Sequence, residues 1–276
     1  GFGSVFRAKD VKDGKIVAEG TADKPIVFTG ENDTYDGVDG IEKLANGTWG
    51  GLIILGSAPT NNPSNDYRVE GIPEQNDYPA QYGGTNAKDN SGVLKYVSIR
   101  HGGSDIGSGN EINGLTLGAV GNGTKINNIE VISNKDDGVE WFGGTVNTKN
   151  LFVAYCGDDA YDYDEGFQGK GQFWTAIQAV GTGGRLGEHD SGGDGEGTKP
   201  YSKPVIYNAT FVGNGSETLI TFRDDAGGTY ANSIFYNTSE GIEIEYRDDK
   251  PHCSWDQFAT EGNLVIKNNI FKSVGK

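Results

Sequence analysis

Short runs of apolar residues alternate with polar residues along most of the chain. The segments VEW (139–141) and YDYD (161–164) both alternate with a period of two, which is typical of β-strands with one buried face. No sustained 3.6-residue apolar period occurs, so we expect hardly any α-helix. Runs bounded by turn residues predict strands at 15–20, 25–30, 51–57, 93–102, 113–120, 127–133, 151–156, 173–180, 204–213, 218–224, 232–237, 241–248 and 264–274.

The pattern of these runs repeats along the chain. Residues 129–150 and 151–172 match at an offset of 22, which places Ile129 on Leu151 and Glu140 on Asp162. Periods in the low twenties indicate a solenoid, in which each repeat is one coil that buries its apolar face only by stacking. We therefore predict an all-β protein, a single right-handed parallel β-helix over residues 1–276. Three stretches break the period and are expected as loop insertions: about 57–92, 181–203 and 250–262.

A second repeat lies further along the chain, at an offset of 24. It places Arg223-Asp224-Asp225 on Arg247-Asp248-Asp249. The same offset predicts that Ile242, Ile244 and Tyr246 lie beside Thr218, Ile220 and Phe222.

Composition and charge limit the range of possible binding partners. The 45 glycines against 8 prolines indicate many tight turns. The formal net charge of −16 disfavours nucleic acid and anionic membrane surfaces and suits divalent cations. No apolar run is long enough for membrane insertion. The absence of methionine and of a signal peptide predicts a mature or trimmed segment of a longer protein. Cys156 and Cys253 can form a disulfide or remain free thiols.

Several phrases of the chain carry a family resemblance. They are KIVAEGTADKPIVFTG, GTWGGLIILGSAPTN, DNSGVLKYVSIRHGG, GNEINGLTLGAVGNGT and NIEVISNKDDGVEWFGGTVN. Over most of residues 15–180 the sequence resembles a family of secreted bacterial right-handed parallel β-helix proteins, and from residue 181 only the general coil pattern remains. The resemblance implies the fold and export, but no reaction. The wider fold family includes pectate lyases, polygalacturonases and phage tailspikes, so the fold alone does not determine the function.

Stacking of the repeats would bring acidic residues together. Carboxylates one strand spacing apart repel one another, and a hard cation such as Ca²⁺ would relieve the repulsion. The candidate ligands on this acidic ladder, which also contains Glu140, are Asp136, Asp137, Asp158, Asp159, Asp162, Asp164 and Glu165. A second candidate calcium site is a glycine-rich loop with Asp190, Asp194 and Glu196. The alternative is a solvated face on which aspartates cap turns.

Signals for catalysis are weak. Paired carboxylates are the minimum for glycoside hydrolysis, but the downstream patterns of polygalacturonases are absent. Arg223 and Arg247 could act as bases in a lyase, but each is followed by two aspartates, which favours salt bridges. The three histidines show no metal-binding spacing. We therefore assign no catalytic residues.

Exposed aromatic residues on the insertions could stack on sugar rings. Tyr67, Tyr78, Tyr82 and Trp255 are the candidates for ligand binding, whereas Trp49, Trp141 and Trp174 are expected in the core. We expect a secreted or cell-surface structural or binding β-helix that recognises an extracellular polysaccharide, with Ca²⁺ as the cofactor. Self-association through the ends of the β-helix would build a fibre. The alternative function is a Ca²⁺-dependent polysaccharide lyase or glycoside hydrolase.

Overall fold

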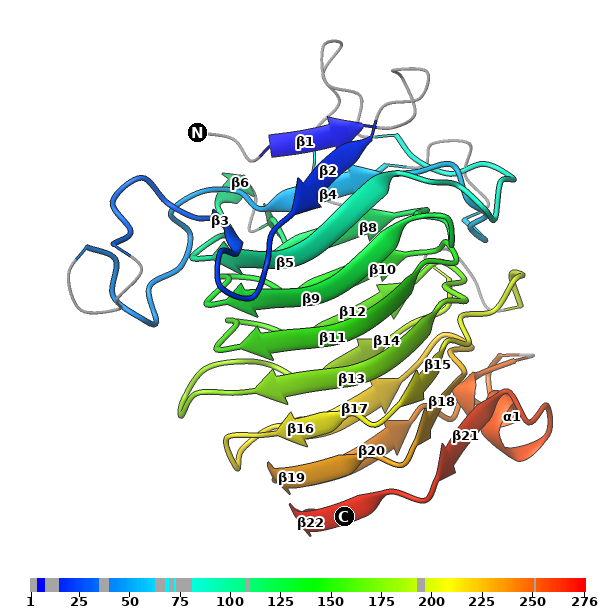
Figure 1. Cartoon of the computed structure of the whole chain (residues 1–276). Helices are drawn as coiled ribbons and strands as arrows, with labels where there is room; N and C mark the ends of the chain where they lie inside the picture. Colours follow the sequence, from blue (N-terminus) through cyan, green and yellow to red (C-terminus); the bar gives the residue numbers. More distant parts are fainter. Residues whose placement is uncertain are drawn as a thin grey trace.

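The computed structural model describes residues 4–7, 15–34, 40–62, 68–69, 72, 81–107, 110–192, 197–250 and 252–276. The chain forms a parallel β-helix in which successive coils stack from β1 to β22 (Figure 1). The first long sheet has eight strands, in spatial order β1 (Ser4–Arg7), β4 (Leu52–Leu55), β8 (Leu115–Gly118), β10 (Val139–Phe142), β12 (Tyr161–Asp164), β14 (Gly187–His189), β17 (Thr218–Phe222) and β20 (Glu240–Ile244). All its pairs are parallel, as the repeat predicts.

The second long sheet has twelve strands. Its main path is β2 (Ile16–Glu19), β5 (Gly92–Arg100), β9 (Lys125–Ile132), β11 (Asn147–Ala154), β13 (Lys170–Ile177), β15 (Val205–Tyr207), β18 (Gly228–Ala231) and β21 (Leu264–Lys267). Beside this path lie β3 (Ile26–Phe28), β16 (Thr210–Val212), β19 (Ile234–Thr238) and β22 (Ile270–Val274). Ile129 pairs with Leu151, which confirms the 22-residue repeat.

The remaining elements are short. An antiparallel pair, β6 (Asp105–Gly107) and β7 (Asn110–Glu111), lies outside the two long sheets. A six-residue helix, α1 (Ser254–Ala259), is the one α-helix in the described residues and lies within the predicted third insertion. No helix in this part of the chain is long and apolar enough to cross a membrane. Cys156 and Cys253 are both buried free thiols.

A single left-handed residue bends each coil within the twelve-stranded sheet. Asn128 and Asn150 have φ values of 55° and 54°, and each is skipped in the strand register. Asparagine tolerates this conformation better than most residues. Because of the bend, Ile126 and Ile129 are both buried although they are three positions apart, a spacing that a period of two does not predict.

Aromatic side chains fill the interior of the coils. Trp141 stacks on Trp174 with ring centroids 4.8 Å apart, and Tyr161 stacks on Trp174 at 4.9 Å. All three side chains are fully buried, so the predicted core positions of Trp141 and Trp174 are confirmed. Trp49 is only half-buried and packs against the edge of this core.

Two predictions about the later coils were wrong. In the eight-stranded sheet Ile220 pairs with Ile242 and Phe222 with Ile244, so the offset there is 22 and not 24. The 24-residue offset holds only in the other sheet, where Thr210 pairs with Ile234. A two-residue shift keeps every side chain on its face, so the alternation could not reveal the error.

The second wrong prediction concerns the insertion at 181–203. Residues 187–189 of that stretch form β14, a regular strand between β12 and β17. This coil therefore belongs to the β-helix, and Asp190 follows a sheet strand rather than lying in a free loop.

We expect replacement of Trp141 by alanine to lower the free energy of unfolding by about 3–5 kcal/mol, because it removes a fully buried ring from the aromatic stack. Replacement of Tyr246, which is 69% exposed, should cost less than about 0.5 kcal/mol. Urea denaturation of both variants measures the difference. Equal losses would contradict the interior stack.

Candidate functional site

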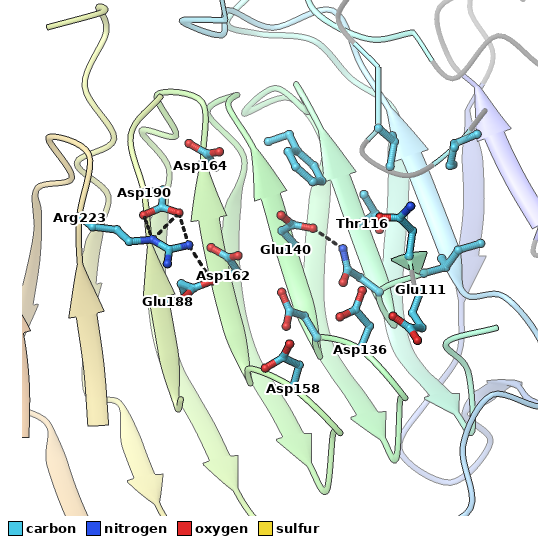
Figure 2. A pocket seen from close by; sticks show the side chains of 17 residues that line it. Glu111, Thr116, Asp136, Glu140, Asp158, Asp162, Asp164, Glu188, Asp190 and Arg223 are labelled. Atoms are coloured by element: carbon cyan, nitrogen blue, oxygen red, sulfur yellow. Dashed lines mark hydrogen bonds and ion pairs between the residues drawn. The ribbon is translucent and has the colours of Figure 1, made fainter. Parts of the chain in front are cut away.

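A row of polar side chains crosses the outer face of the eight-stranded sheet. Glu140 on β10 pairs with Thr116 on β8 and with Asp162 on β12, and Asp162 pairs with Glu188 on β14. Their sequence neighbours, such as Trp141, point into the core. The alternation of the strands therefore directs this whole row outward, and Figure 2 shows it on one face.

The row forms the floor of a groove with a volume of about 360 Å³. Its acidic lining residues are Glu111, Asp136, Asp137, Glu140, Asp158, Asp162, Asp164, Glu188 and Asp190, and its one basic lining residue among those described is Arg223. Apolar side chains of Val69, Ile72, Ile112 and Phe142 also line it. The acidic excess produces a strongly negative field within a concave, partly desolvated space.

Arg223 anchors one end of the groove. Its Nε donates to Asp190 Oδ1 at 2.7 Å and its Nη2 to Asp190 Oδ2 at 2.9 Å. The same Nη2 lies 3.1 Å from Glu188 Oε2, and Arg185 Nη1 lies 2.6 Å from Glu188 Oε1. The predicted salt-bridge role of Arg223 is confirmed, although its partners come from the preceding coil and not from its own two aspartates.

Burial raises the pKa of several carboxyl groups here. The pKa values of Asp137, Asp159 and Asp162 are held well above their usual range. Desolvation is the larger cause, and repulsion from neighbouring carboxylates is the smaller one. Desolvation also raises the pKa of Asp164 to about 8. The pKa of Asp190 rises only to about 6, because its bonds to Arg223 oppose the desolvation.

Two buried oxygen atoms at the centre of the groove lack a hydrogen-bond partner among the described residues. They are Asp162 Oδ1 and Thr116 Oγ1. Asp162 is 9% exposed and Thr116 is 1% exposed, and both line the groove. A buried polar atom without a partner is costly, so these two atoms suit a ligand that binds oxygen.

The structure brings some of the predicted metal ligands together. Asp136, Asp137 and Asp158 each offer an oxygen within 4.8 Å of the others, and so do Asp137, Glu140 and Asp162. These are carboxylates of the ladder in successive coils, as predicted. The groups are made entirely of oxygen donors, which is the ligand type that Ca²⁺ prefers.

Other predicted ligands lie elsewhere. Asp159 Oδ1 accepts a hydrogen bond from the backbone N–H of Arg185, which is the turn-capping role of the alternative interpretation. Asp164 lies in the next row, beside Asp190. Glu165 accepts hydrogen bonds from Asn62 Nδ2 and Tyr82 Oη, both at 2.8 Å. None of these three residues belongs to either ligand group.

Of the three residues of the predicted calcium loop, Asp190, Asp194 and Glu196, the structure describes only Asp190. Asp190 is bound to Arg223 at the end of the groove, and Asp194 and Glu196 lie outside the described residues. Sequence reasoning missed the role of Glu188. The signal was present, because the acid–aromatic–acid alternation of EHD (188–190) repeats that of DYD (162–164).

The aromatic candidates differ from one another. The expectation that Tyr82 is exposed was wrong: its side chain is fully buried and packs on Phe142 with ring centroids 6.0 Å apart. It belongs to a second apolar cluster, outside the coils, which also contains Ile53 and Leu55. Trp255 is 42% exposed and lies 5.5 Å from the ring of Phe258. Tyr67 and Tyr78 lie outside the described residues.

The stacked parallel strands and the groove on their outer face are those of a parallel β-helix protein. The model of one family, the pectate-lyase-like β-helix domain, matches residues 10–276, and the chain belongs to this family. No curated protein and no solved structure matches the chain.

The raised pKa values predict a pH dependence of the cation-free protein. Unfolded carboxyl groups titrate near about 4, so above that pH the folded chain holds more protons than the unfolded chain. The free energy of unfolding should then fall as the pH rises through the folded pKa values, by up to about 1.4 kcal/mol per pH unit for each extra proton. We expect Tm in EDTA to fall from about pH 5 to about pH 8, the pKa of Asp164. Asp164→Asn should flatten this slope, and a rise of Tm over the same interval would contradict the prediction.

Proposed function

We propose that this β-helix is an extracellular binding protein whose acidic groove takes up a segment of polysaccharide with the help of a divalent cation. The groove itself carries the proposal: about 360 Å³ is the size of a small-ligand site. Its carboxylates can accept hydrogen bonds from sugar hydroxyls, and its apolar wall at Val69, Ile72 and Phe142 can contact a pyranose ring.

The rigidity of the floor supports this role. Glu140, Asp162 and Glu188 are fixed by hydrogen-bonded strands whose inner faces pack in the aromatic core. A binding surface of this kind is largely formed before the ligand arrives, so little conformational entropy is lost on binding. The name of the family fits a carbohydrate ligand as well.

We expect Asp162→Asn to weaken polysaccharide binding at least about tenfold, or ~1.4 kcal/mol, because it changes the buried carboxylate at the centre of the groove. Glu243→Gln is the matched control, since Glu243 follows in the same outward row but is exposed and outside the groove. Calorimetric titration with a panel of neutral, acidic and amino polysaccharides, in calcium and in EDTA, gives the affinities. If no polysaccharide of the panel binds in the presence of Ca²⁺, the proposal is wrong.

A second candidate function is enzymatic cleavage of the same glycan, by hydrolysis or by lyase-type elimination. Asp164 and Asp190 line the groove from adjacent coils, and a carboxylate pair is the minimum for glycoside hydrolysis. Binding without turnover is favoured because Arg223, the one basic lining residue among those described, is held by Asp190 and Glu188. Reducing-end and unsaturated-uronate assays separate the two functions. Turnover that Asp164→Asn abolishes would establish the enzyme.

Self-association through an end of the β-helix is a further part of the proposal. Among the described strands β20, β21 and β22 are the last in their stacks, and each pairs on one side only. Ile270 and Phe271 on β22 are 60% and 46% exposed. An open, partly apolar edge of this kind can pair with another chain.

We expect the protein to form larger species as its concentration rises, and Phe271→Glu to shift sedimentation toward the monomer. Val180→Glu, at a position that is 91% exposed and far from this edge in sequence, is the control. Sedimentation velocity measures both. A protein that stays monomeric at all concentrations would remove self-association and leave the groove unaffected.

A further inference from the structure

We propose that the groove holds two divalent cations that share one ligand, the carboxylate of Asp137. The inference concerns the groove of the proposed function, but it does not require a glycan, because the cations can bind to the protein alone. We call the position between Asp137, Glu140 and Asp162 the inner position, and that between Asp136, Asp137 and Asp158 the outer position.

The inner position is buried. Asp137 and Glu140 are each 8% exposed and Asp162 is 9% exposed. Glu140 and Asp162 are direct neighbours in the sheet, and Asp137 belongs to the turn that leads into β10. One oxygen from each residue lies within 4.8 Å of the other two.

An independent observation points to a ligand at this inner position. Asp162 Oδ1 and Thr116 Oγ1 are buried without a hydrogen-bond partner in the described part of the chain. Thr116 and Asp162 are the two strand neighbours of Glu140, one on each side. Thr116 and Asp162 are therefore two strand spacings apart, about 10 Å, and one ion cannot contact both. A cation held by Asp137, Glu140 and Asp162 would satisfy Asp162 Oδ1, the buried oxygen that belongs to this group.

The outer position lies nearer the solvent. Asp158 is exposed and Asp136 is half-buried, and Figure 2 shows their side chains below Glu140 and Asp162. Both residues come from the turns that precede β10 and β12, one coil apart. A cation here could keep water molecules as ligands, as exposed calcium sites commonly do.

Asp137 is placed to bridge the two positions, since it is a member of both groups. Its Oδ1 accepts a hydrogen bond of 2.9 Å from the backbone N–H of Asp159, which fixes the orientation of the carboxylate. A carboxylate has about four lone-pair directions on two oxygens. This hydrogen bond occupies one of them and leaves three for two cations.

The charge of the two groups also favours two ions over one. The groups contain five different carboxyl groups: Asp136, Asp137, Glu140, Asp158 and Asp162. When all are ionised, one divalent cation leaves three negative charges within the groups, whereas two leave a single charge. The number of carboxylates favours Ca²⁺, which accepts six to eight oxygen ligands in flexible geometries, over Mg²⁺, which requires near-octahedral geometry and usually keeps several waters.

The test is a count of bound ions on the whole chain. After treatment with EDTA and its removal, calorimetry and equilibrium dialysis with Ca²⁺ alone should give two ions per chain, bound more tightly than Mg²⁺. Asp162→Asn should keep only the outer ion, and Asp158→Asn only the inner ion. Asp137→Asn should weaken the binding of both ions by at least about tenfold. Changes to residues that only support metal ligands already reduce metal affinity by about this factor. Glu243→Gln, outside both groups, should keep two ions.

A thermal melt supplies a second measurement that a purely structural role would not reproduce. Asp137→Asn and Asp162→Asn each replace a buried carboxyl group of the cluster, whose ionised form is costly there, by a neutral amide. We expect both variants to melt at a higher temperature than the parent protein in EDTA and at a lower temperature in saturating Ca²⁺. Circular dichroism is the check that both variants fold.

The outcomes are distinct. No bound Ca²⁺, or a single ion lost in all three variants, would overturn the two-ion proposal. Two ions of which Asp137→Asn weakens only one would overturn the bridge. Two bound ions without any polysaccharide binding would leave this inference intact and remove the proposed function.

Discussion

The in-register stacking of parallel coils is the constraint on which the rest of this structure depends. Strand pairs such as Val139–Tyr161 and Glu140–Asp162 bring equivalent side chains of successive coils within about 5 Å of each other. Inside the coils this spacing lets the rings of register partners stack, as Tyr163 and His189 do with ring centroids 3.8 Å apart. The same geometry applies outside the coils, where it brings like charges together.

Interior and groove therefore show opposite consequences of one geometry. The apolar ladder stabilises the fold by burial, whereas the carboxylate ladder opposes it through desolvation and repulsion. Two kinds of donor relieve this cost within the chain: side chains, such as Arg223, Arg185, Lys135 and Asn113, and backbone N–H groups at the turns. The centre of the groove, at Asp162 and Thr116, keeps oxygen atoms that neither kind reaches. Functional sites commonly retain such local conflicts between stability and chemistry.

The sequence was sufficient for the fold because the repeat and the alternation report on the same geometry. The 22-residue match correctly paired Ile129 with Leu151 and Glu140 with Asp162. It failed where the two sheets have different offsets, so that Ile242 lies beside Ile220 and not beside Thr218. It also missed β14, because a strand of three residues amid glycines carries too little apolar signal.

The candidate site could be predicted only in part, for a physical reason. The repeat correctly placed the acidic residues in neighbouring coils. It could not predict which carboxyl group turns toward which partner. Asp159 and Glu165 are acidic like Asp137, yet a backbone N–H of the next coil and the hydroxyl of Tyr82 hold them. Those partners come from segments that the repeat does not include, and Tyr82 is buried by contacts with Phe142 that no local pattern encodes.

A parallel β-helix offers the same outer sheet to many different functions, so the distribution of charge on that sheet is more informative than the fold. Here the outer face is apolar at Ile53 and Leu55, acidic at Glu140 and Asp162, and ion-paired at Arg223. Only the middle zone combines burial, negative charge and oxygen atoms without a partner in the described chain. Because β8, β10 and β12 fix this zone through their backbone pairs, a ligand there would meet donors that are already in position. The specificity of the protein would then depend on which cations and hydroxyl groups fit this fixed array, and not on a rearrangement of the coils.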